Sequence, residues 1–276
     1  MTLFRWRGRG GAAQTTKTPL AQAMALYQAG RYAEAEAEAR SVAAARSQRR
    51  DDTYAPLALG LAALAAGAQG RHADAVTTYD ALLPVFGRIF GAEDAQTLKL
   101  RSDRAQALSS LARHGECEAE CAAVFHLASR GAGPDMALIA AAARNGQIFA
   151  LTALGRHKEA ETLACEALAA HRERDRFSLV LRLGLARSLN GQGRHEEALA
   201  ETRRADALHR VLPEEQQRPE TGAVQVVMAT ALVGLGRGTE ARHLAAAAQD
   251  VCLAAFGPDH RRTTEATALL ARIDGE

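Results

Sequence analysis

The sequence is poor in aromatic residues and cysteine, and each shortage excludes a class of protein. Aromatic residues make up 4% of the 276 residues, and the β-branched and aromatic residues never form the alternating runs typical of strands. Four cysteines are too few for a disulfide framework. No uninterrupted apolar run reaches about 18 residues, and residues 1–18 lack the apolar core of a signal peptide. We therefore expect a soluble, cytoplasmic protein without a membrane span.

Motifs for nucleotide binding and for nucleophilic catalysis are also missing. The chain contains no Gly-Lys pair, which a phosphate-binding loop requires, and no Gly-x-Ser-x-Gly sequence. His195-Glu196 begins like a zinc-protease helix, but Leu199 occupies the position of the second histidine. We predict that the protein is not an enzyme and that it needs no cofactor.

The charges are close to balance, with 34 basic and 32 acidic residues and a formal net charge of +2. A protein that binds nucleic acid usually has a marked basic excess, so we expect no nucleic-acid partner. Only Lys17, Lys99 and Lys158 are lysines among the basic residues. We interpret this arginine and alanine bias as typical of a GC-rich genome, and we infer an actinobacterial origin.

The chain does contain a short pattern that occurs six times at intervals of 38 to 43 residues. In most copies it reads Gly-Arg, then tyrosine or histidine, then an acidic residue and alanine. Its first residues are Gly30, Gly70, Ala112, Gly155, Gly193 and Gly236. Self-similarity at such a period is the signature of a repeat architecture.

Each position of the pattern has a physical reason. Glycine ends a helix in the left-handed conformation at no steric cost, and an acidic residue in the next first turn favours the positive end of that helix. Small residues at the sixth position let two helices approach closely. Further small and aliphatic residues seven and four positions before each turn share one helical face. We therefore predict six helical hairpins, with a less sharp turn at Ala112.

This pattern resembles the tetratricopeptide repeat, in the long-period variant of kinesin light chains. Phe90-Gly91 and Phe256-Gly257 begin two stretches, 166 residues apart, that resemble its linker between repeats. The resemblance covers about residues 17–274. It implies an all-α fold: a right-handed α-solenoid of about six such helix-turn-helix repeats plus a capping helix over residues 258–273. We expect this solenoid over residues 17–276 and a flexible basic leader over residues 1–16.

Histidine and cysteine residues offer candidate metal sites, but a structural interpretation is simpler. His72, His114, His157 and His195 occupy the same position in four repeats, so the fold separates them. His114, Cys117 and Cys121 could meet one metal ion, yet Cys117 stands at the small-residue position, where cysteine acts as a small hydrophobe. We predict no metal site.

The leader is the one basic and aromatic segment. It places Phe4, Arg5, Trp6, Arg7 and Arg9 before any acidic residue. Such a segment could contact nucleic acid, an anionic membrane or an acidic partner, but we favour a disordered leader.

The resemblance also implies where a partner binds, because the first helices of such repeats line a concave groove. The positions that correspond to groove residues include Lys99, Gln106, Asn145, Phe149, Arg187 and Asn190. Amides there could bond a peptide backbone, and Lys99 and Arg187 could meet carboxylates, although an ordinary wet surface is the alternative. The first-repeat positions are Leu20 and Met24, which do not support the terminal-carboxylate ligand of chaperone-binding members.

We therefore predict a non-catalytic scaffold or adaptor for a protein or peptide. One alternative is a peptide-sensing regulatory module that acts on a transcription or signalling partner. A more distant alternative is nucleic-acid binding through the turn arginines, which would depend steeply on salt.

Overall fold

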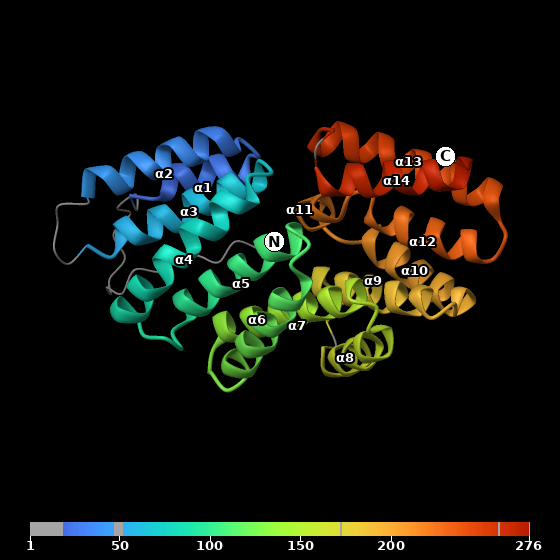
Figure 1. Ribbon diagram of the computed structural model, residues 1–276, viewed down its shortest axis with the longest axis horizontal. Coiled ribbons are helices and arrows are strands. Elements are labelled where there is room, and N and C mark those ends of the chain that lie inside the picture. Colours follow the sequence, from blue (N-terminus) through green and yellow to red (C-terminus); the bar gives the residue numbers. More distant parts are fainter. Residues whose placement is uncertain (1–18, 47–51, 172, 259, 276) are drawn as a thin grey trace. The chain divides into compact units, whose positions relative to one another are not determined.

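The computed structural model describes residues 19–46, 52–171, 173–258 and 260–275, which form fourteen α-helices, one short 3₁₀ helix and no strand (Figure 1). This confirms the predicted all-α class. Within these residues no helix is long and apolar enough to cross a bilayer. The predicted leader, with Phe4–Arg9, lies outside the described residues.

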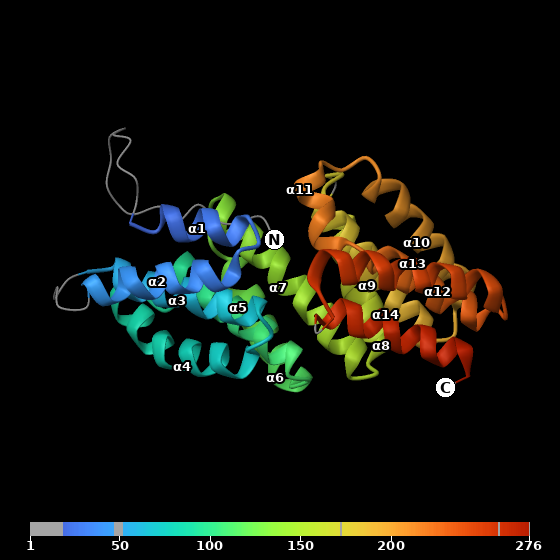
Figure 2. The same cartoon turned by 90° about the horizontal axis from the view of Figure 1, so that it is seen from above.

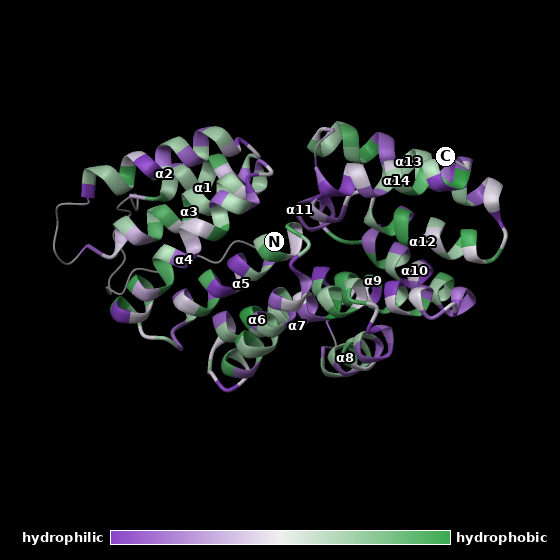
Figure 3. Ribbon diagram, viewed as in Figure 1, coloured by the Kyte–Doolittle hydropathy of each residue, from purple (hydrophilic) through white to green (hydrophobic). Residues whose placement is uncertain are grey.

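Twelve of the helices follow one another as six hairpins, one for each copy of the pattern. The pairs are α1 Ala21–Gln28 with α2 Tyr32–Arg46, α3 Tyr54–Ala68 with α4 His72–Ile89, α5 Ala95–Ser110 with α6 His114–Ala128, α7 Pro134–Ala153 with α8 His157–Ala170, α9 Arg176–Gly191 with α10 His195–His209, and α12 Ala223–Gly234 with α13 Gly238–Phe256. The remaining elements are α11 Glu214–Gln217, the 3₁₀ helix η1 Arg218–Glu220, and α14 Arg261–Asp274. The short α11 is polar, as its purple colour in Figure 3 shows.

The described helices divide into two compact units, one from α1 to Ala140 of α7 and one from Ala141 of α7 to α14. In each unit, helices that follow one another along the chain pack together. In the C-terminal unit α14 packs against α13 and also against α12, and Figure 2 shows α13 and α14 side by side. This helix therefore covers the end of the last hairpin, as the predicted capping helix should.

All six turns adopt the left-handed conformation, including the one that lacks glycine. The five turn glycines have φ between 71° and 85°, and Ala112 has φ 58°. At each turn the next arginine donates its backbone N–H to the carbonyl five residues earlier, as in a Schellman motif, for example Arg113 to Leu108 at 3.0 Å and Arg156 to Leu151 at 2.9 Å. The prediction of a less sharp turn at Ala112 is therefore wrong, because the repeat imposes the same backbone on alanine.

The core consists of the small residues that the pattern predicted. Every residue at the sixth position is buried, from Ala35 at 0% exposure to Cys117 at 2%. The positions seven and four before each turn are also buried: Ala23, Ala63, Ala105, Ile148, Ala186, Ala229, Leu26, Ala66, Leu108, Leu151, Leu189 and Leu232. In the C-terminal unit one apolar cluster extends from Ile148 on α7 to Leu269 on α14. Close approach of the helices thus depends on alanine at their contacts.

The two resembling linkers have the same local structure. Gly91 and Gly257 both have positive φ, at 103° and 85°. Six residues later a buried threonine donates its hydroxyl to the glycine carbonyl: Thr97 at 2.7 Å and Thr263 at 2.8 Å. The first turns of α5 and α14 are therefore equivalent, and α14 is the first helix of a seventh, unpaired repeat.

Candidate functional site

The turn arginines are occupied by ion pairs. Each of the six lies close to the acidic residue three positions later, and five of these pairs have distances of 2.7 Å or less. Arg71 lies 3.7 Å from Asp74 and also binds Glu36 of the preceding repeat. Arg194 similarly binds Glu161 of the preceding repeat at 2.7 Å. Because each turn arginine is already paired with a carboxylate, the six arginines provide little net positive charge for binding phosphates. This argues against the nucleic-acid alternative.

The repeated histidines pack against the next repeat. A Cβ atom added to Gly191 would lie 2.3 Å from the ring of His157, and one added to Gly234 would lie 2.3 Å from the ring of His195. Both glycines stand two positions before a turn, so each ring fills the space that the next repeat leaves open. This favours the structural interpretation of these histidines.

Cys117 and Cys121 are buried in α6, with 4.0 Å between their sulfur atoms. The hydrogen bond with Cys117 and burial raise the pKa of Cys121 above its ordinary value. A thiol that stays protonated is a poor metal ligand. Burial at the small-residue position is in keeping with a packing role for Cys117.

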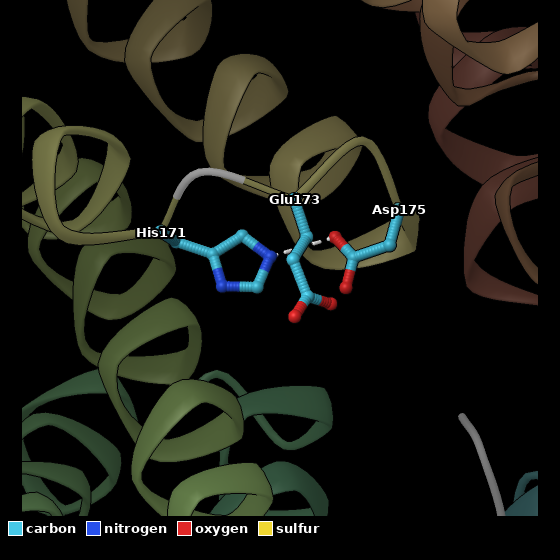
Figure 4. A group of neighbouring side chains, drawn as sticks. All are labelled: His171, Glu173 and Asp175. Carbon is cyan, nitrogen blue, oxygen red and sulfur yellow. Dashed lines mark hydrogen bonds and ion pairs between the residues drawn. The ribbon is translucent and has the colours of Figure 1, made fainter.

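One group of potential metal ligands does occur among the described residues, in the segment between α8 and α9. One ligand atom each of His171, Glu173 and Asp175 lies within 4.8 Å of the others (Figure 4). The His171 Nε2 atom lies 2.8 Å from the Asp175 carboxylate, which also accepts the backbone N–H of Ser178 at 3.0 Å. Asp175 is therefore the N-cap of α9 and His171 supports it, which explains the group without a metal ion.

In the N-terminal unit the predicted groove residues Lys99 and Gln106 lie on α5. Gln106 is exposed, but Lys99 is only 8% exposed and its ammonium lies 2.5 Å from the Asp103 carboxylate. Burial raises the pKa of Asp103 even though Lys99 lowers it, and burial also raises the pKa values of Tyr27 and Tyr79. Lys99 thus belongs to a buried polar cluster, and a ligand carboxylate would have to replace Asp103.

In the C-terminal unit the predicted residues lie on α7 and α9, and all four are partly buried. Arg187 donates to Glu265 of α14 at 3.3 Å. Asn190 donates to the Val227 carbonyl of α12 at 3.2 Å, and its own oxygen lies 3.2 Å from His195 Nδ1. Asn190 therefore joins neighbouring repeats, and Asn145 and Phe149 are half-buried on α7.

Arg261 and Glu265 of α14 lie in this part of the C-terminal unit, and the sequence prediction missed both. The Arg261 guanidinium lies 4.9 Å from the centroid of the Phe149 ring. The equivalence of the linkers could have pointed to Glu265, because Glu265 follows Lys99 by the same 166 residues that separate Phe256 from Phe90. Glu265 thus stands at the position that corresponds to Lys99, whereas Arg261 corresponds to Ala95.

A buried carboxylate fixes the start of α14. Glu220 of η1 accepts from Arg176 of α9 and from Arg262 of α14, at 2.5 Å each. Burial alone would raise the pKa of Glu220, but Arg262 and Arg176 lower it to about 2. The resulting ion triad connects η1, α9 and α14. Because Arg261 is the neighbour of Arg262 in the chain, the triad also positions Arg261.

Surface depressions lie elsewhere in the C-terminal unit. One of about 350 Å³ lies over α10, α12 and α13 and includes Met228, His243 and Leu244, and another of about 340 Å³ lies around His157 and Gln192. Neither includes a predicted groove residue.

Comparisons with known proteins support the fold. No protein-family model and no curated protein matches the sequence. Nearly identical TPR-like repeats of a Podosopora anserina protein described as a kinesin light chain match with a TM-score of 0.59 and 19% identity, over 69% of this chain and 92% of that one. Acl4, an assembly chaperone of RpL4, matches with a TM-score of 0.52 and 18% identity, over 94% and 95% of the two chains. The fold is that of a tetratricopeptide repeat (TPR) array.

A third solved structure extends the likeness over most of the chain. The Cut9–Hcn1 hetero-tetramer of the APC/C matches with a TM-score of 0.57 and 13% identity, over 92% of this chain and 48% of that one. These identities are too low to carry a partner or a binding residue from those proteins to this chain.

Proposed function

We propose that the chain is a non-catalytic scaffold or adaptor that binds a protein or peptide along the first helices of its repeats. The observation that carries this proposal is the contact between Phe149 on α7 and Arg261 on α14. Two helix pairs lie between these elements in the chain, so the first helices of the C-terminal unit curve around a common concave side. Packing between neighbours stabilises such an array and leaves that side for a partner.

The chemistry of the surface also supports this function. Asn145 and Gln106 present amides that can bond a peptide backbone, Phe149 presents an aromatic ring, and Arg187 is held by a single long contact with Glu265. Two similar structures are of proteins that assemble with others or assist assembly, the Cut9–Hcn1 hetero-tetramer and the assembly chaperone of RpL4. The cytoplasmic location, the actinobacterial origin and the regulatory alternative stay predictions from the sequence.

The test is capture of partners from an extract of the native cell by the full chain. A variant with Asn145→Ala and Arg187→Ala should capture the specific partners less well, because it removes an amide and a cation from the concave side. Arg210→Ala is a matched control, since Arg210 is exposed at the C-terminal cap of α10 and pairs with Asp206 of that helix. If all three proteins capture the same partners equally, the groove assignment fails.

A further inference from the structure

Arginines of α9 and α14 form a cluster in the C-terminal unit that has fewer carboxylates than guanidinium groups. Arg176 and Arg187 project from α9, and Arg261 and Arg262 project from α14. The carboxylates that influence Arg261 are Glu265 and Glu220, and its cationic neighbours are Arg187 and Arg262. Four guanidinium groups therefore share two carboxylates.

These carboxylates do not satisfy the arginines equally. Glu220 is bound by Arg176 and Arg262, so both of its oxygens are occupied. Glu265 accepts from Arg187 at 3.3 Å, a long contact for an ion pair. Among the described residues Arg261 forms no hydrogen bond or ion pair, and its contact is the face of Phe149. The donors of Arg261 therefore remain available to a ligand.

The surroundings of Arg261 are those of a recessed site. Its side chain is exposed to solvent, yet burial by the surrounding protein lowers its pKa, as do the charges of Arg187 and Arg262. An anion that binds Arg261 would also reduce its repulsion with Arg187 and Arg262. The ring of Phe149 supports one face of the guanidinium, which leaves its edge to form paired hydrogen bonds.

We propose that Arg261, stacked on Phe149 and flanked by Arg187, binds a glutamate or aspartate side chain of the partner polypeptide. The planar fork of arginine suits a carboxylate, and Asn145 lies one helical turn before Phe149 on α7, where its amide can bond the peptide backbone. This inference rests on the proposed function and specifies its ligand as an acidic peptide segment. The proposed site lies towards the C-terminal end of the array, not at the first-repeat positions where chaperone-binding members hold a terminal carboxylate.

Glu265 acts as an internal competitor in this arrangement. Its carboxylate binds Arg187 and lies close to Arg261, so an incoming acidic side chain must overcome its repulsion. Replacing it with glutamine should release Arg187 and strengthen binding. An increase in affinity is a sharp test, because a variant that folds poorly cannot produce it.

The experiment measures fluorescence anisotropy of a labelled oligoglutamate peptide with the full chain, and an oligoglutamine peptide of the same length is the control ligand. Arg261→Gln should weaken binding of oligoglutamate by about tenfold or more, the loss expected for a charge-assisted hydrogen bond. Glu265→Gln should strengthen it several-fold, and Arg210→Gln should leave it unchanged. Circular dichroism checks that the variants keep their fold.

Three outcomes would overturn the proposal: equal binding of the two peptides, no loss with Arg261→Gln in a folded protein, or binding of a phosphoserine peptide without binding of oligoglutamate. These outcomes are separate from failure of the scaffold function. If Arg261→Gln has no effect while Asn145→Ala with Arg187→Ala abolishes partner capture, the groove binds a partner of another chemistry. If no variant affects capture, the scaffold proposal fails as well.

Discussion

At the scale of single residues, the turns show how strongly the repeat determines local backbone. Ala112 has φ 58°, a conformation that costs a residue with a Cβ about 1–2 kcal/mol. It is tolerated because the hydrogen bond of Arg113 to Leu108 and the buried Cys117 and Leu108 fix both helices. The third repeat therefore keeps the geometry of the others at a cost in stability.

Replacing Ala112 with glycine should stabilise the protein by about 1 kcal/mol, because glycine removes the steric penalty. Urea unfolding followed by circular dichroism measures the change. Ala119→Gly is the control, since Ala119 is exposed inside α6 and its replacement should destabilise the helix by about 0.5–1 kcal/mol. A destabilising Ala112→Gly would mean that the turn is not strained.

The histidine positions can be tested in the same way. Gly191→Ala should destabilise the protein by about 1–3 kcal/mol, because the new Cβ would lie 2.3 Å from the His157 ring. The double variant with His157→Ala should recover part of that loss, which a double-mutant cycle measures. Gly115→Ala meets no atom within 4 Å and should be stabilising. Additive effects of the first two changes would refute packing between His157 and the next repeat.

At the scale of elements, the attachment of α14 depends on a buried ion triad as well as on apolar contacts. Glu220 is 4% exposed and binds arginines from α9 and α14. Removing one member of such a buried group leaves the others uncompensated, which is costly. The triad therefore makes the C-terminal cap sensitive to acid.

The pKa of Glu220 is about 2 in the folded protein, below the ordinary glutamate value of 4.5, because Arg262 and Arg176 outweigh the effect of burial. Its contribution to stability is therefore complete above about pH 4.5 and is lost as the pH falls towards 2. The shift corresponds to about 3 kcal/mol. Glu220→Gln should remove most of this pH dependence and destabilise the C-terminal unit at neutral pH.

Unfolding in urea at several pH values between 2 and 7 measures this effect. Glu215→Gln is the matched control, because Glu215 is exposed on the neighbouring α11 and should change little. If the free energy of unfolding of Glu220→Gln falls between pH 4.5 and pH 2 as much as that of the unchanged protein, other carboxylates dominate the loss of stability in acid.

At the scale of the whole molecule, the helices divide into two compact units, and α14 packs against α12 and α13 of the C-terminal one. Its residues Ala266 and Leu269 lie in the cluster that also includes Ala245 and Ala248 of α13. In repeat proteins each repeat depends mainly on its neighbours, so loss of the cap should act locally.

Truncation after Phe256 should therefore reduce protection of α12 and α13 from amide hydrogen exchange while α1–α6 keep theirs. Exchange measured by mass spectrometry gives both results in one experiment. The variant Leu269→Ala, expected to cost about 2–4 kcal/mol, tests the same interface without exposing it fully. Equal loss of protection in α1–α6 would contradict independent stabilisation of the units.

The local architecture follows from short-range patterns in the sequence. Glycine or a tolerated alanine at each turn, a small buried residue six positions into each pattern, and the Gly91–Thr97 and Gly257–Thr263 linkers are short-range features. They depend on backbone conformation and helix periodicity, so six hairpins and a capping helix followed from them. The acidic first-turn residues were also predictable, although their pairing with the turn arginines was not noticed.

Only the tertiary structure decided which polar side chains are available. Lys99 and Arg187 are equally good candidates for binding a carboxylate when only the sequence is known. In the structure Asp103 neutralises Lys99 within its own helix. Arg187 instead donates a long hydrogen bond to Glu265, which is 78 residues away in the chain. Nothing in the sequence singles out Arg261, because its proposed role depends on stacking of its guanidinium on the ring of Phe149. Whether a charge is neutralised is set by groups brought together across repeats, and neither helix periodicity nor composition contains that information.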